Sequence, residues 1–82
     1  MKNKFILESM ASDLKRVALG LHRGSKKMAS RFLEESLKRK DELNMSEVAP
    51  YLKKFISKLD GKIEAEDALM YSTLIQNYSQ KL

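Results

Sequence analysis

The 82-residue sequence contains no cysteine, no tryptophan, one proline, three glycines and one histidine. Without cysteine the chain can form neither disulfides nor thiolate metal sites, and His22 alone cannot build a structural zinc site. An all-β protein needs many turns, in which proline and glycine are common. The low content of both argues against that class. These absences predict a helical protein that holds no cofactor and no metal ion.

Long hydrophobic segments are also lacking. Apolar runs such as 5–7 and 17–19 are far shorter than the about 20 residues that a membrane-spanning helix needs. Lys2 and Lys4 precede the first run, but Glu8 interrupts it, which is unlike a secretory signal. We therefore expect a cytoplasmic protein without a membrane span, folded as a single helical-bundle domain over residues 1–82.

Charge is unevenly distributed along the chain, whose formal net charge is +5. Residues 1–40 carry eleven basic and four acidic side chains, whereas residues 41–82 carry five basic and seven acidic ones. Clustered cations attract nucleic acid and other polyanions through counterion release. The candidate polyanion-binding residues are Arg23, Lys26, Lys27, Arg31, Lys38, Arg39 and Lys40.

Two apolar series at helical spacing occupy the basic half, and each predicts an amphipathic helix. The first is Ile6, Leu7, Met10, Leu14, Val17 and Leu21, with Ala11 and Ala18 beside it and Lys15, Arg16 and Arg23 opposite. The second is Met28, Ala29, Phe32, Leu33 and Leu37, in a helix that reaches about Lys40. Glu34 and Lys38 are spaced for a surface ion pair on this second helix.

Residues 20–25 join the two apolar series, and whether they form a turn or continue the helix determines whether the chain has four helices or three. Gly20 is suited to a left-handed helix C-cap and Ser25 to an N-cap, so we predict a break or sharp kink here. The alternative is one continuous helix, since three leucines and Met28 lie seven residues apart. In that case Gly20 and Gly24 would permit close approach of another helix in an oligomer.

The second half of the chain predicts two further helices. Asn44 or Ser46 is the expected cap of the first, Pro50 suits its first turn, and Asp60 with Gly61 ends it. Its apolar stripe is Val48, Tyr51, Leu52, Phe55, Ile56 and Leu59. The last helix begins at about Ile63 with an acidic first turn, and one side carries Ala65, Ala68, Leu69, Ser72, Ile75 and Tyr78. The fold class is thus an all-α antiparallel bundle.

No set of residues predicts catalysis. Arg16 and His22 are separated by five residues, a spacing that resembles the Arg-x(4–6)-His element of the HEPN ribonucleases. This resemblance implies that His22 would act as a general base and that Arg16 would stabilise the phosphorane. Val17 stands where that family usually has a polar residue, so we interpret both as surface side chains of a protein that is not an enzyme.

The leading hypothesis is therefore a protein-interaction or oligomerisation module. Apolar stripes broader than one helical partner requires, on a core this small, lead us to expect a homodimer or another protein partner. The alternative is a nucleic-acid-binding protein that uses the basic segment from Arg23 to Lys40.

Overall fold

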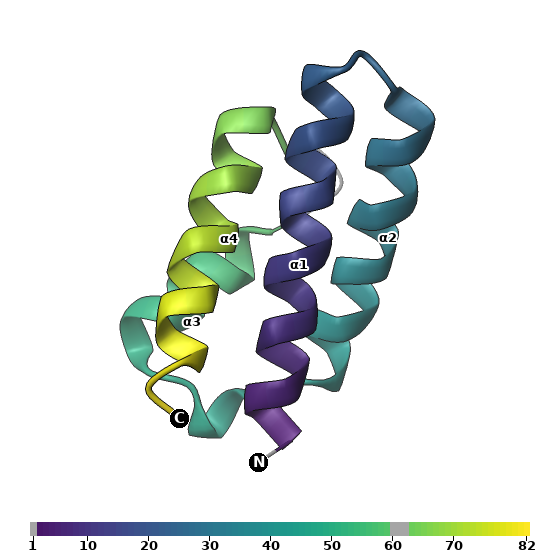
Figure 1. The fold of residues 1–82 in the computed structure, drawn as a ribbon. Helices are drawn as coiled ribbons and strands as arrows, with labels where there is room; N and C mark the ends of the chain where they lie inside the picture. The colour runs from purple at the N-terminus through teal and green to yellow at the C-terminus, as the bar shows by residue number, and fades with distance from the viewer. Residues whose placement is uncertain (1, 60–62) are drawn as a thin grey trace.

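The computed structural model describes residues 2–59 and 63–82, and within them the chain forms four α-helices and one short 3-10 helix (Figure 1). The α-helices are α1 (Lys2–His22), α2 (Lys26–Glu42), α3 (Pro50–Lys58) and α4 (Ala65–Ser79), and the 3-10 helix η1 (Met45–Glu47) precedes α3. Helix α1 lies between α2 and α4 and runs antiparallel to both. The predicted all-α antiparallel bundle with four helices is confirmed.

Helices α1 and α2 are separate, as the caps predicted. Gly24 adopts a positive φ of 74° directly after α1. The Ser25 N–H donates to the Gly20 carbonyl at 2.8 Å and the Gly24 N–H to the Leu21 carbonyl at 3.2 Å, which together form a Schellman cap. Ser25 also begins α2, because its hydroxyl accepts from the Met28 N–H at 3.3 Å. This turn excludes the continuous helix.

The prediction that Gly20 is the left-handed cap is wrong, since Gly24 takes that role. Gly20 is buried inside α1, where it faces α2. A Cβ atom on Gly20 would lie 2.9 Å from the Ala29 backbone nitrogen, closer than van der Waals contact permits. Gly20 therefore permits a close helix approach, and the helix that it approaches is α2 of the same chain.

The segment before α3 differs from the prediction. Asn44 caps η1, with its side chain accepting from the Ser46 N–H at 3.3 Å, and neither Asn44 nor Ser46 caps α3. Helix α3 begins at Pro50 after Ala49, so Val48 lies outside it. Val48 and Ala49 are extended, with ψ of 138° and 143°, and the residue before a proline is disfavoured in helical conformation, so the 3-10 turn does not continue into α3.

Two boundaries of the later helices also shift. Helix α3 ends at Lys58 with Leu59 as its cap, while the predicted stop at Asp60 and Gly61 lies outside the described residues. Helix α4 begins at Ala65, two residues after the predicted start, and its first turn is acidic as expected. The apolar spacing predicts Leu69 on the buried side of α4, but Leu69 is 49% exposed.

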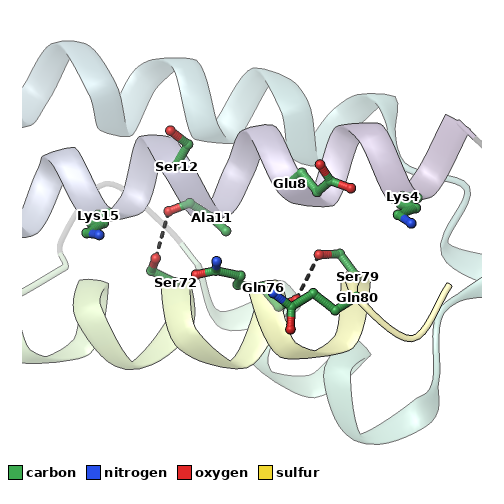
Figure 2. Close-up of a pocket in the computed structure, with 9 residues that line it drawn as sticks. All are labelled: Lys4, Glu8, Ala11, Ser12, Lys15, Ser72, Gln76, Ser79 and Gln80. Atoms are coloured by element: carbon green, nitrogen blue, oxygen red, sulfur yellow. Dashed lines mark hydrogen bonds between the residues drawn. The ribbon is translucent and has the colours of Figure 1, made fainter.

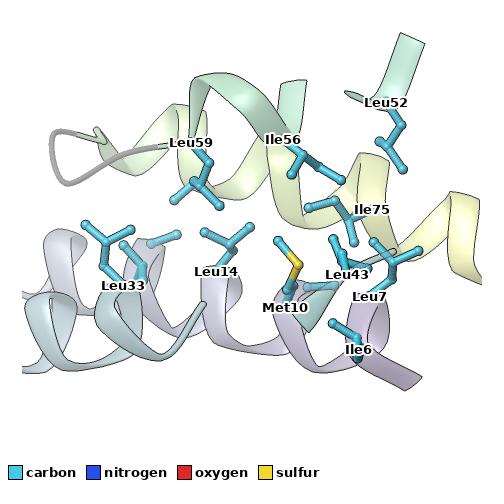
Figure 3. Packing of buried hydrophobic residues seen from close by; sticks show 14 of the residues in the cluster. Ile6, Leu7, Met10, Leu14, Leu33, Leu43, Leu52, Ile56, Leu59 and Ile75 are labelled. Atoms are coloured by element: carbon cyan, nitrogen blue, oxygen red, sulfur yellow. The ribbon is translucent and has the colours of Figure 1, made fainter. Parts of the chain in front are cut away.

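The core is built around α1 (Figure 3). Met10 and Leu14 are fully buried and point toward Ile56 of α3 and Ile75 of α4. Small residues, among them Ala11, Ala18, Ala68 and Ser72, bring α1 and α4 together, and the Ser72 hydroxyl donates to the Ala11 carbonyl at 2.7 Å. The opposite edge of α4 packs on α3 through edge-to-face aromatic pairs: Tyr51 with Tyr78 and Phe55 with Tyr71.

Candidate functional site

The structure divides the seven candidate cations between the two ends of α2. Arg23, in the turn before α2, and Lys26, Lys27 and Arg31, in its first turns, form what we call the turn cluster. All four are exposed, and none of them takes part in a salt bridge among the described residues. Lys38, Arg39 and Lys40 lie toward the other end of α2, from about 10 Å (Arg31 to Lys38) to about 20 Å (Lys26 to Lys40) away at 1.5 Å per residue. The two groups differ in their partners.

The three cations at the far end of α2 already have partners within the chain. Lys38 lies 3.7 Å from Glu35, which replaces the predicted pair with Glu34, and Arg39 lies 3.4 Å from Glu42. The Lys40 ammonium donates to the Leu59 carbonyl at 3.0 Å, where it meets the negative end of α3. These partners reduce the charge that this end of α2 can offer to a polyanion.

Between α1 and α2 a partly buried carboxylate is surrounded by charges. The Asp13 side chain is 14% exposed and lies 3.9 Å from Arg16. Burial raises the pKa of the Asp13 carboxyl above its ordinary value, against the opposing effect of Arg39 and Arg16, while Glu35 adds to the rise. The Asp13 side chain therefore carries its charge at a cost to the fold.

Arg16 and His22 have different surroundings in the structure. The Arg16 guanidinium lies over the Phe32 ring, 5.3 Å from its centroid, and donates to the Ser12 hydroxyl at 3.1 Å. His22 is an exposed residue at the end of α1. Packing against α2 accounts for Arg16, and no hydrogen bond joins it to His22 among the described residues.

A polar groove runs between α1 and α4 (Figure 2). It encloses about 470 Å³ and is lined from α1 by Lys4, Glu8, Ala11, Ser12 and Lys15, and from α4 and its end by Ser72, Gln76, Ser79 and Gln80. Its two serines on α4 are buried and donate to backbone carbonyls. The charged groups at its rim, by contrast, are exposed to solvent.

Sequence reasoning expected apolar surface beyond the needs of one helical partner but missed its location, the outer face of α4, because it assigned Leu69 to the buried side. Leu69 is 49% and Met70 43% exposed, and with Leu74, Thr73 and Glu66 they line a shallow groove of about 420 Å³. The signal was present in the sequence, because the apolar run 68–71 covers more of the helix than one buried face can use. A helix that is apolar beyond its buried face has surface left for a partner.

Within residues 2–59 and 63–82, no three acidic or histidine side chains gather as a metal site would require. No helix in this part of the chain is both long and apolar enough to cross a bilayer. No family model, curated protein or solved structure matches the chain.

Proposed function

We propose that this protein is a protein-interaction module whose binding surface is the outer face of α4. The observation that carries the proposal is the groove formed by Leu69, Met70 and Leu74, where two large apolar side chains lie nearly half exposed next to each other. Burying such side chains contributes a favourable transfer free energy of about 25 cal/mol for each Å² of apolar area removed from water, which offsets part of the cost of association. Exposed apolar residues in one groove are typical of sites that receive a partner's helix.

The charges around this groove favour one kind of partner. Glu66 lines it, and Glu64 and Asp67 are exposed in the same region at the start of α4. A partner helix with apolar residues on one face and basic residues at one end would pair its cations with these carboxylates. We therefore propose an amphipathic segment of another protein, with lysine or arginine at the end that meets Glu66, as the ligand of α4.

Affinity purification with matched variants tests this proposal. The tagged chain, its Met70→Lys variant and its Ser57→Lys variant are compared in a native lysate; both variants add one positive charge at an exposed helical position. We expect a partner that the parent and Ser57→Lys retain and Met70→Lys loses. Retention that does not depend on Met70, or no retained partner at all, would contradict the proposal.

Polyanion binding by the turn cluster is a second candidate. Its specific support is that Arg23, Lys26, Lys27 and Arg31 are all exposed and take part in none of the salt bridges of the described residues. Four cations at one end of the bundle could contact a run of phosphates. The groups with intramolecular partners, Lys38, Arg39 and Lys40, are not part of this proposed site.

A further inference from the structure

On the surface of α1 that faces away from the core, two large apolar side chains lie in line with a serine between them, and we call these three residues the stripe. Phe5 is 68% and Leu19 42% exposed, and the exposed Ser12 lies midway between them. Seven residues make about two turns of helix, so the three side chains lie nearly in line. Buried leucines at positions 7 and 14 occupy the opposite, core-facing side. The stripe therefore lies on the side of α1 that faces away from the core.

Two opposite charges flank this stripe on the side of α4. Glu8 and Lys15 both lie at the rim of the polar groove (Figure 2). Both are exposed, and neither is in a salt bridge among the described residues. They are seven residues apart, so they share one edge of the helix but are too distant along its axis, about 10 Å, to pair with each other. Both can pair with charges that another chain brings to this edge.

We propose that a second copy of this chain binds here, with the two α1 helices packed antiparallel about a two-fold axis at Ser12. In that register Phe5 faces Leu19 of the second copy, and the reverse contact follows from the symmetry. Measured along the helix axis, Glu8 then lies one residue, about 1.5 Å, from Lys15 of the second copy. A two-fold axis across antiparallel helices keeps both residues on the same edge, so two ion pairs form.

Three features of α1 favour a second copy over another occupant. The stripe is symmetric about Ser12, with a large apolar side chain seven residues away on either side. The charges are self-complementary, because the edge that carries Glu8 also carries Lys15. Ser12 at the axis is small enough to let the helices approach, and Arg16, which donates to its hydroxyl at 3.1 Å, lies toward Phe32 of α2 on the other edge. This interface is separate from the groove on α4.

Exchange of the two charges tests the register. Glu8→Lys and Lys15→Glu each turn two attractive pairs into two repulsive ones, so we expect each variant to dimerise at least about tenfold more weakly than the parent. The doubly substituted chain, and an equimolar mixture of the two single variants, restore opposite charges at every pair. Both are expected to dimerise as the parent does. When one of the two variants is labelled uniformly with ¹⁵N, native mass spectrometry resolves the heterodimer from either homodimer by mass.

Matched controls separate this interface from others. Lys54→Glu reverses an exposed charge on α3 and should leave dimerisation unchanged, while Phe5→Ser with Leu19→Ser should abolish it. Circular dichroism checks that every variant remains helical. A monomeric parent chain at about 100 µM would overturn the proposal. So would a dimer that both single charge variants retain, since that dimer would use another surface such as α4.

Discussion

Asn3 and Asn44, 41 residues apart, exchange two hydrogen bonds through the Asn3 side-chain amide. The Asn3 Nδ2 donates to the Asn44 carbonyl and the Asn44 N–H donates to the Asn3 Oδ1, both at 3.0 Å. Tyr78 makes a further long-range hydrogen bond to this region, because its hydroxyl accepts from the Ala49 N–H at 3.0 Å. The irregular segment before α3 is thus fixed to both α1 and α4.

Replacing Asn3 with alanine should destabilise the protein by about 1–3 kcal/mol, because it leaves two backbone groups of Asn44 without their partner. Asn77→Ala is the control, since Asn77 is exposed on α4 and its loss should change stability by no more than about 0.5 kcal/mol. Urea unfolding of both variants measures the difference. Equal stability of the two variants would show that the Asn3 amide contributes nothing.

Gly20→Ala should also destabilise the fold. The added Cβ would meet the Ala29 backbone at 2.9 Å, which forces α1 and α2 apart at a cost of about 1–3 kcal/mol. Alanine's better helix propensity offsets about 1 kcal/mol of that cost. Ser30→Ala, at an exposed position of α2, is the control for helix propensity. A Gly20→Ala variant that gains stability in thermal unfolding would refute the close approach.

Asp13→Asn should increase stability at neutral pH. Burial raises the pKa of Asp13, so the folded protein holds this proton to a higher pH than the unfolded chain does, and folding loses stability as the pH rises through that window. Asparagine carries no charge, so the variant does not lose stability as the pH rises. The gain should shrink as the pH falls below about 4, where the unfolded carboxyl is protonated too. Urea unfolding from pH 3 to 7 measures it, and lower stability of Asp13→Asn at pH 7 would contradict this account.

Any binding to duplex DNA should depend on the turn cluster and not on the far end of α2. Lys27→Gln with Arg31→Gln removes two exposed cations, and Lys38→Gln with Arg39→Gln removes two that already have carboxylate partners. The first pair should lower the salt slope of binding by about 1.8, at about 0.9 for each phosphate that the variant no longer neutralises. The second should leave it nearly unchanged. Fluorescence anisotropy at several salt concentrations measures the slope for each double variant. Equal slopes for the two double variants would contradict the proposal that only the turn cluster binds DNA.

The presence of four helices, though not all of their ends, could be predicted from local information. The 3.6-residue spacing of Leu7, Met10 and Leu14 defines a buried face, and Ser25 caps α2 through a hydrogen bond that spans only three residues. Such features depend on neighbours in sequence, so the sequence suffices to place them.

Contacts between distant segments could not be predicted in the same way. Gly20 resembles a cap because glycine suits one, and only the position of Ala29 on α2 shows that it is needed for packing. Lys40 belongs to a cationic cluster in the sequence, but its hydrogen bond to the Leu59 carbonyl depends on how α2 and α3 pack. The spacing of Leu69 predicts a core residue, but the sequence does not show which of its apolar residues a helix turns toward its packing partners.

Photo-crosslinking in cells tests the central claim, that the outer face of α4 binds another protein, most directly. A photoreactive amino acid is placed at Met70 in one chain and at Ser57 of α3 in another, both at exposed positions. The account predicts a discrete crosslinked product with a different protein from position 70 and none from position 57. No product from position 70, or the same products from both positions, would contradict it.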